Sequence, residues 1–247
     1  MREDTANRPK IPSPPREKMK PYYEEKGIQI YLGDCREILP SLPKVDLVLT
    51  DPPYGVIGGS KAIGGSGFVK VNEYDLSWDM APVSHKELQM MMDISKNQII
   101  FGINYFWDFF KPTNSLIVWD KKCQNGWNDT FSDGEIAWTS LGGKLKIYRQ
   151  LWVGALRKGD TIKREHPTQK PAELMRWCIL QVEESAIDSS CSCHLYSPCT
   201  ILDPFMGSGT TLRAAKDLGR QAIGIEICEA YCEIAAKRLQ QEVFAFK

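Results

Sequence analysis

A carboxylate, two prolines and an aromatic ring follow one another in the tetrapeptide Asp51-Pro52-Pro53-Tyr54. The prolines restrict the backbone, so the Asp51 carboxylate and the Pro52 carbonyl would form two preorganised hydrogen-bond acceptors. Acceptors that hold the hydrogens of an exocyclic amino group push electron density onto its nitrogen and favour its attack on a sulfonium methyl group. The Tyr54 ring offers a flat face on which an extruded base can stack. The alternative interpretation is a stiff loop with an exposed aromatic side chain.

A second candidate is the turn DPFMGSGTT, which spans residues 203–211. Gly207 and Gly209 permit a tight bend that a ligand can approach closely, and the helix expected next offers free N–H groups. About 20 residues later Glu226 ends the following strand, a spacing that suits two ribose hydroxyls of a nucleoside cofactor. The turn lacks the third glycine of GxGxxG and a P-loop lysine, so a cofactor without phosphates, such as S-adenosylmethionine, fits better. An ordinary strand–turn–helix connection is the alternative.

Both candidates follow short apolar runs, 45–50 and 200–203, of the kind buried in parallel sheets. The chain alternates such strands with helical patterns, which predicts a doubly wound, mostly parallel α/β sheet. Since ligands bind at the carboxyl ends of strands in such sheets, we expect the candidates to border one crevice. Further strands are expected at 27–32, 98–101, 116–119, 135–139, 146–153 and 221–226, and helices at 35–42, 84–96, 104–110, 172–182, 211–218 and 229–241.

The formal net charge is zero, but the charges are unevenly distributed. Residues 144–170 carry eight basic side chains against two acidic ones, which gives one segment the character of a nucleic-acid contact. No apolar run approaches the roughly 18–20 residues that span a bilayer, and no secretory h-region is visible, so we expect a cytoplasmic protein. The eight cysteines are expected to be reduced thiols. The cluster at 191–199 lacks paired CxxC spacing, so no metal is expected.

The motifs together resemble the amino-group DNA methyltransferases, which modify adenine N6 or cytosine N4, in the circularly permuted order called the β group. In that order the catalytic tetrapeptide 51–54 precedes the cofactor turn FMGSGTT at 205–211. The segment HPTQKP at 166–171 is similar to the family's segment before that turn. GDC at 33–35 is similar to its element that binds the cofactor adenine. The motifs stand in family order over about residues 22–242.

The resemblance implies a seven-stranded Rossmann-like sheet with S-adenosylmethionine across its switch point. It implies that Asp51, Pro52, Pro53 and Tyr54 carry the methyl transfer. Asp34 would contact the cofactor adenine, Glu226 the ribose, Asp203 the amino group, and Thr168 and Lys170 the carboxylate. The full set of implied cofactor-binding residues is Asp34, Thr168, Lys170, Asp203, Phe205, Gly207, Gly209, Thr210 and Glu226.

Adenine N6 is the favoured target, because the family's N4-cytosine members usually have Ser where this chain has Asp51. An N4-cytosine enzyme is the first alternative, beside RNA and protein-amide methyltransferases. The protein-amide enzymes generally place Asn first and their site after the cofactor turn. A catalytically inactive DNA- or cofactor-binding module is the alternative from another class, against which the intact Asp51 and Gly207 argue. Double-stranded DNA with a flipped base is the expected partner, with a homodimer and a cognate restriction enzyme left open.

Organisation along the chain predicts a flexible tail at 1–20, with four prolines, and one methyltransferase domain at 21–247. Only 45 residues separate Asp120 from His166, so no large separate target-recognition domain is expected. DNA sequence would then be read by the segments 55–77, 121–134 or 144–164, or by a second subunit. Lys163 and Arg164 are predicted to contact DNA phosphates, with solvated surface charges as the alternative.

Overall fold

The structure is a computed structural model that describes residues 19–55, 81–123, 132–153, 156–157, 169–187 and 199–241. Thr168, Lys163 and Arg164 lie outside these ranges, as do the cysteines at 191 and 193 and most of the glycine-rich segment after Tyr54. No helix within these ranges has the length and apolar character required to cross a bilayer.

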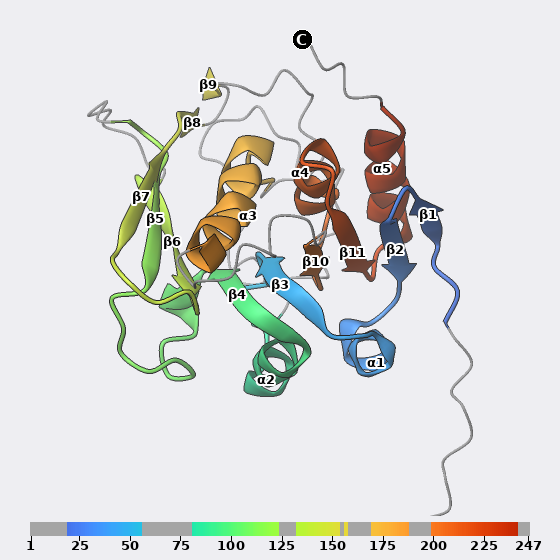
Figure 1. Cartoon of the computed structure of the whole chain (residues 1–247), viewed down its shortest axis with the longest axis horizontal. Coiled ribbons are helices and arrows are strands. Elements are labelled where there is room, and N and C mark those ends of the chain that lie inside the picture. The colour runs from blue at the N-terminus through green and yellow to red at the C-terminus, as the bar shows by residue number, and fades with distance from the viewer. Residues whose placement is uncertain are drawn as a thin grey trace, which may run out of the picture.

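Among the described residues, nine strands form one mixed sheet in the order β1-β2-β11-β10-β3-β4-β6-β5-β7 (Figure 1). Their bounds are β1 Tyr23–Glu25, β2 Ile28–Leu32, β3 Val45–Thr50, β4 Ser95–Phe101, β5 Leu116–Asp120, β6 Gly134–Thr139, β7 Lys146–Arg149, β10 Thr200–Asp203 and β11 Gln221–Glu226. The five central strands, from β2 to β4 in this order, pair in parallel. The predicted α/β class is therefore confirmed, with a larger sheet than the seven strands implied by the resemblance.

The additional edge strand β1 comes from a hairpin that the sequence prediction missed. Lys26 and Gly27 have φ values of 48° and 81° and form the two-residue loop between β1 and β2. Positive φ at both loop residues is the requirement of a tight type I′ hairpin, and glycine meets it without steric cost. A two-residue strand pair elsewhere, β8 Trp152–Val153 with β9 Leu156–Arg157, lies outside the main sheet.

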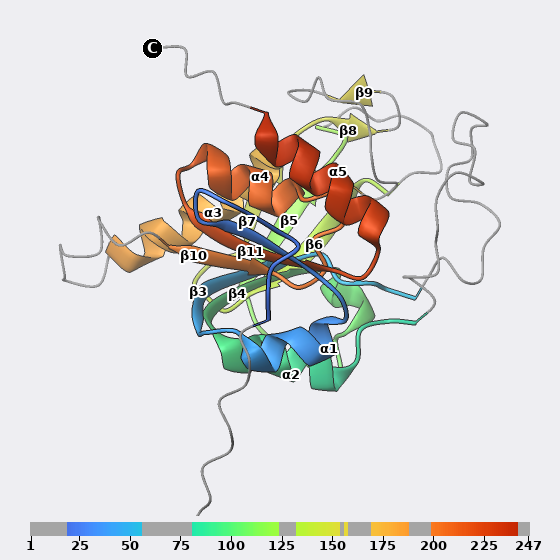
Figure 2. The same cartoon turned by 90° about the vertical axis from the view of Figure 1, so that its right-hand side faces the viewer.

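The helices cover both faces of the sheet (Figure 2). On one face lie α1 Cys35–Ile38 and α2 His85–Ile94, and on the other lie α3 Ala172–Ile187, α4 Thr210–Asp217 and α5 Glu229–Gln240. Strand β3 shows the alternation that this arrangement demands, because Leu47 and Leu49 pack into one buried core and Val48 into the other. Apolar residues on both faces explain why Leu47, Val48 and Leu49 follow one another without a polar residue between them.

The centre of the sheet holds the point where the strand order reverses. Strand β3 pairs with β10 in parallel, with Leu47 opposite Ile201 and Val48 opposite Leu202. From this pair the chain proceeds to β4 on one side and to β11 on the other. The carboxyl ends of β3 and β10 therefore flank a topological switch point, where open α/β sheets bind ligands.

Two predicted elements differ from the structure. The helix expected at 104–110 is wrong, since the structure has only a short 3-10 turn at Ile103–Tyr105. It starts from Gly102, whose left-handed φ of 75° breaks the strand and redirects the chain. The strand expected at 146–153 is also divided, because β7 ends at Arg149 and a separate strand, β8, begins at Trp152.

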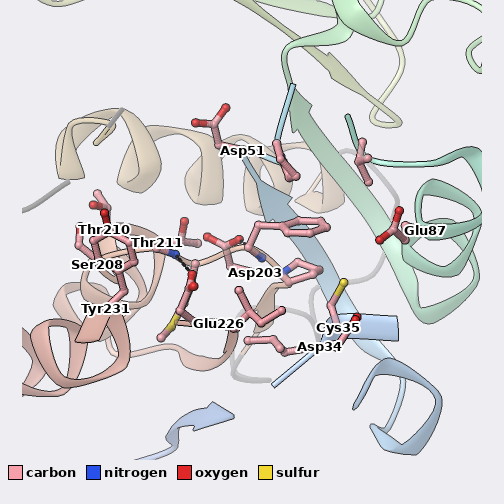
Figure 3. A pocket seen from close by; sticks show the side chains of 18 of the residues that line it. Asp34, Cys35, Asp51, Glu87, Asp203, Ser208, Thr210, Thr211, Glu226 and Tyr231 are labelled. Carbon is pink, nitrogen blue, oxygen red and sulfur yellow. Dashed lines mark hydrogen bonds between the residues drawn. The ribbon is translucent and has the colours of Figure 1, made fainter. Parts of the chain in front are cut away.

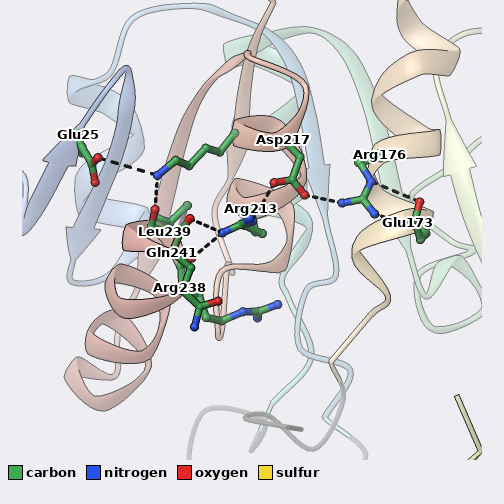
Figure 4. A network of polar contacts seen from close by, with 9 residues as sticks. Glu25, Glu173, Arg176, Arg213, Asp217, Arg238, Leu239 and Gln241 are labelled. Carbon is green, nitrogen blue, oxygen red and sulfur yellow. Dashed lines mark hydrogen bonds and ion pairs between the residues drawn. The ribbon is translucent and has the colours of Figure 1, made fainter. Parts of the chain in front are cut away.

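A polar network joins the three helices on the face of α3, α4 and α5 (Figure 4). Asp217, at the end of α4, accepts a hydrogen bond from Arg213 Nε at 2.8 Å and forms an ion pair with Arg176 of α3. Arg213 also donates through Nη1 to the carbonyl oxygens of Arg238 and Gln241, at 2.8 and 2.9 Å, at the end of α5. These contacts hold α4, the helix that follows the glycine turn, against both of its neighbours.

Candidate active site

A cavity of about 520 Å³ opens at the carboxyl ends of β3 and β10. Its lining comes from six places that are distant in sequence: the turn after β2, the end of β3, the start of α2, the segment that leads into α3, the turn between β10 and α4, and the end of β11 with the start of α5. Five acidic side chains, Asp34, Asp51, Glu87, Asp203 and Glu226, belong to that lining, and Figure 3 shows Asp203 between Asp51 and Asp34. The cavity is thus rich in acceptors and suited to a ligand that carries positive charge and several donors.

The tetrapeptide 51–54 is anchored at several atoms. Asp51 Oδ1 accepts a short hydrogen bond from Tyr54 Oη, and the Pro53 carbonyl accepts from Val83 N at 3.0 Å. Burial, followed by the nearby Asp51 charge, holds the pKa of Tyr54 well above its usual value, so its hydroxyl stays a donor. Asp51 and Pro53 line the cavity, whereas Pro52 and Tyr54 are not among the lining residues.

The ring of Tyr54 stacks on Tyr105, with centroids 4.6 Å apart and an interplanar angle of 16°. Gly102 makes room for this ring, because a Cβ at that position would lie 2.0 Å from Tyr54 Cε1. One face of Tyr54 is therefore occupied by another aromatic side chain. Stacking of a base on this tyrosine stays a prediction that concerns the opposite face.

Glu226 ties the glycine turn to the end of β11. Its Oε2 accepts from Gly207 N at 3.0 Å and its Oε1 accepts from Cys228 N at 2.8 Å. Burial raises the pKa of Glu226, and the backbone donors oppose that rise. A carboxylate held on both oxygens by backbone N–H groups is fixed in direction and presents its remaining lone pairs to the cavity.

The other residues of the turn divide into two groups. Phe205, Gly207 and Thr210 line the cavity, and their contact with a cofactor stays a prediction. Gly209 is not a lining residue: with a φ of 78° it precedes α4, and a Cβ there would lie 2.7 Å from Ala235 Cβ of α5. The second glycine is thus required by the backbone bend and by helix packing.

Asp203 is buried below the turn, where its Oδ1 accepts from Thr50 Oγ1 at 2.7 Å and from Phe205 N at 3.2 Å. Burial raises the pKa of Asp203 to about 6, although hydrogen bonds from Thr211, Thr50 and Phe205 N counteract it. The charge of Asp51 raises it further. A cation bound beside Asp203 would stabilise the ionised form of this carboxyl group.

Asp34 marks the opposite end of the cavity and caps α1, as its sequence position predicts. Its Oδ1 accepts from Arg36 N at 2.8 Å and from Arg36 Nε at 2.9 Å. The Arg36 guanidinium lowers the pKa of Asp34, so this carboxylate stays charged. Gly33 N donates to the Glu226 carbonyl at 2.9 Å, which fixes the Asp34 turn beside the end of β11.

Lys170 does not point to a free position in the cavity. Its Nζ binds Asp51 Oδ2 at 2.5 Å and Glu135 Oε2 at 2.8 Å. The contact with the cofactor carboxylate that the resemblance implies for Lys170 and Thr168 stays a prediction, and Thr168 lies outside the described residues.

The profile of a protein family described as DNA methylase, N6_N4_Mtase, matches residues 45–237. The chain belongs to this DNA methylase family. It is 26% identical to the Type II methyltransferase M2.LlaDCHI of Lactococcus lactis subsp. cremoris, over 90% of this chain and 93% of that protein. It is 27% identical to the Type II methyltransferase M2.DpnII of Streptococcus pneumoniae, with the same two shares. The resemblance inferred from the motifs is confirmed.

Solved structures agree with this assignment. The crystal structure of the M1.HpyAVI–SAM complex has a TM-score of 0.51 and 28% identity, and the match covers 85% of this methylase and 99% of that chain. PvuII DNA methyltransferase (cytosine-N4-specific) has a TM-score of 0.56 at 17% identity, covers 92% of this methylase and 91% of that chain, and shares the fold.

Sequence reasoning missed several residues that shape the site of this methylase. Glu135 and Lys121 contact each other and Glu135 reaches Lys170, yet neither belongs to a recognisable motif. Tyr105 and Thr50 act through a ring contact and a hydroxyl that only the folded chain brings to Tyr54 and Asp203. An acidic residue at the start of an expected strand was the single signal that could have identified Glu135. Within the described part of the chain, no cluster of three His, Cys, Asp or Glu residues could hold a metal ion.

Proposed function

We propose that this DNA methylase transfers a methyl group from S-adenosylmethionine to the exocyclic N6 of adenine in double-stranded DNA. The observation that carries the proposal is that Asp51 and the glycine turn border one cavity at the ends of adjacent strands. A methyl donor and a base can therefore meet between them.

The hydrogen-bond acceptors that line the cavity suit the donor groups of the proposed cofactor. Glu226 has lone pairs for the ribose hydroxyls, and Asp34 lies at the end assigned to the adenine ring. Asp203 is a buried carboxyl whose pKa of about 6 drops when an ammonium group binds beside it. When bound, S-adenosylmethionine supplies an electrophilic sulfonium methyl group. The anionic lining stabilises the positive charge of such a ligand.

Asp51 and the Pro52 carbonyl each accept a hydrogen bond from one of the two N–H groups of the target amino group. Both acceptors are fixed before the base arrives. Tyr54 and Lys170 hold the Asp51 carboxylate, and the two proline rings restrict the backbone that carries the Pro52 carbonyl. Fixed acceptors need no reorganisation as charge develops on the attacking nitrogen. The target base leaves the duplex to reach them, because a paired base cannot enter a cavity at the edge of a sheet. The carboxylate of Asp51, where N4-cytosine members usually have Ser, supports adenine.

The proposal extends to organisation and partners. Residues 21–247 form one methyltransferase domain without a large separate recognition domain, so the basic segment around Lys163 and Arg164 contacts the duplex. The relatives named Type II methyltransferases support a cognate restriction enzyme as a partner. A second copy of the chain would enlarge the DNA-reading surface.

The test is transfer of labelled methyl from S-adenosylmethionine to unmethylated DNA, followed by digestion to nucleosides. We expect labelled N6-methyldeoxyadenosine. Labelled N4-methyldeoxycytidine would overturn the adenine assignment, and no label in DNA would overturn the activity. Asp51→Ala is expected to abolish transfer while cofactor binding persists. Asp93→Asn, on the exposed face of α2, is the matched control and should keep full activity.

A further inference from the structure

A row of alternating charges stands behind the catalytic tetrapeptide. Lys170 Nζ lies 2.5 Å from Asp51 Oδ2 and 2.8 Å from Glu135 Oε2, so one ammonium group serves two carboxylates. The other oxygen of Glu135 forms a close ion pair with Lys121, and the other oxygen of Asp51 accepts from Tyr54. Each carboxylate oxygen in this row thus has a protein partner.

The position of Glu135 follows from the direction of its strand. Strand β6 runs antiparallel to both β4 and β5, so its first residues lie at the carboxyl edge of the sheet. Glu135 pairs in register with Trp119, one residue before the end of β5. Asp51 and Lys170 line the cavity, whereas Glu135 is not a lining residue. Glu135 therefore stands outside the cavity and acts on Asp51 through its contact with Lys170 and through its own charge.

Burial makes these contacts strong. The Lys170 side chain is 6% exposed, and those of Asp51 and Glu135 are 19% and 26% exposed. Charges taken out of water interact more strongly than surface pairs, and removal of one partner leaves the other uncompensated. If Lys170 paired with Asp51 alone, its charge would weaken Asp51 as a hydrogen-bond acceptor. Because Lys170 also pairs with Glu135, that effect on Asp51 is smaller.

We propose that Lys170 and Glu135 are positioning residues of opposite effect, which together set how strongly Asp51 accepts hydrogen bonds from the target amino group. Lys170 fixes Oδ2 of Asp51 and keeps the carboxylate ionised. Glu135 holds Lys170 between two acceptors and so preserves the acceptor strength of Asp51. This inference rests on the proposed function, since it assigns Asp51 the amino group as its ligand.

The charged and titratable groups around Asp51 define the expected signs. Burial raises the pKa of Asp51, Glu135 adds to that rise, and Lys170 and Tyr54 oppose it. Asp203 lies below in the same cavity, and Tyr105 covers the ring of Tyr54. Burial also raises the pKa of Glu135, but Lys170 and Lys121 outweigh it and lower that pKa to about 2. Loss of Lys170 and loss of Glu135 must therefore shift Asp51 in opposite directions.

The experiment compares the pH dependence of kcat in Lys170→Met, Glu135→Gln and the wild-type enzyme. We expect the acid limb to move up by about one pH unit or more in Lys170→Met, and down in Glu135→Gln. Asp133→Asn is the matched control, because Asp133 is 86% exposed, pairs with Lys122 and lies two residues from Glu135. Its profile should coincide with that of the wild type. Shifts in one common direction, or no shift, would overturn the inference.

A second measurement needs no turnover. The side-chain carboxyl carbons of labelled aspartates are titrated by NMR without cofactor, and the Asp51 signal is assigned by its loss in Asp51→Asn. We expect the midpoint of the Asp51 titration to move up in Lys170→Met and down in Glu135→Gln. Glu135→Gln preserves the shape of the side chain, so it tests the inference even if Lys170→Met fails to fold. A Lys170→Met variant with an unshifted Asp51 and a much weaker calorimetric Kd for S-adenosylmethionine would assign Lys170 to the cofactor instead. If wild-type enzyme modifies no DNA while the NMR shifts appear, the proposed function fails and the charge arrangement stands.

Discussion

The hydroxyl of Thr50 donates a hydrogen bond of 2.7 Å to Asp203 Oδ1, across the junction of β3 and β10. Thr50 is the last residue of β3 and precedes Asp51, while Asp203 ends β10 and begins the glycine turn. Both residues are buried. One contact therefore joins the segment that is proposed to receive the base to the segment that is proposed to hold the cofactor.

The affinity for S-adenosylmethionine should depend on pH through Asp203. Because burial raises the pKa of Asp203 to about 6, the group carries a proton in a large fraction of molecules below pH 6. An ammonium group binds best to the ionised form, so affinity should rise as pH increases from 5 to 7. Calorimetric titration at several pH values measures this rise, and Asp203→Asn should flatten it. An equal pH dependence in both proteins would contradict the role of Asp203.

Protein stability without cofactor should change in the opposite sense. The folded pKa of Asp203, about 6, lies above its ordinary value of 3.8, so the folded state holds the proton more tightly. Its contribution is complete below pH 3.8 and is lost as pH rises through 6, by about 3 kcal/mol in total. Urea unfolding of the wild type and Asp203→Asn across this window isolates the effect. Thr50→Val removes a hydrogen bond that lowers the pKa of Asp203, so the pH at which half of this stability is lost should rise. A lower pH for that midpoint would refute the role of Thr50.

The sequence predicts most of the central fold, because local signals agree with it. The strands predicted at Val45–Thr50 and Gln221–Glu226 match the bounds of β3 and β11, and Asp34 caps α1 as expected. The helix at 104–110 fails for a tertiary reason, since Gly102 bends the chain where Tyr54 needs space. The β1 hairpin was missed because a three-residue strand carries almost no periodic signal.

The candidate site is predictable where chemistry is concentrated in short motifs. Asp51 and Asp203 reach one cavity because adjacent parallel strands end at the same edge. Glu135 and Lys121 could not be assigned, because the contacts of Glu135 with Lys121 and Lys170 depend on β6 running antiparallel, and one residue type in a strand does not specify strand direction. Lys170 was found by motif, and its contact with Asp51 depends on side-chain packing that spacing does not encode.

The packing of α3, α4 and α5 against one another should depend on Asp217 for its stability. This carboxylate stands at the carboxyl end of α4, where the helix dipole disfavours it, and two arginines from α3 and α4 compensate. Asp217→Asn should lower the free energy of unfolding by about 1–3 kcal/mol, as for partly buried ion pairs. Glu233→Gln, from an exposed pair with Lys237, should cost at most about 0.5 kcal/mol. Equal losses in denaturant titrations would show that the network in Figure 4 does not stabilise the fold.

Gly102 should be essential for the orientation of Tyr54. A Cβ at Gly102 would lie 2.0 Å from Cε1 and 2.4 Å from Cζ of the tyrosine ring, so Gly102→Ala must displace that ring and its hydrogen bond to Asp51. The substitution also imposes a left-handed φ of 75° on alanine, which costs about 1–2 kcal/mol by itself. Gly142→Ala separates the two effects, because Gly142 has a φ of 73° and a Cβ added there would meet no other atom within 4 Å. We expect Gly142→Ala to lose stability and keep methyl transfer, and Gly102→Ala to lose more stability and nearly all transfer while it still binds S-adenosylmethionine. Normal transfer by Gly102→Ala would mean that the contact between Tyr54 and Asp51 is dispensable, because the ring cannot stay in place beside an added methyl group.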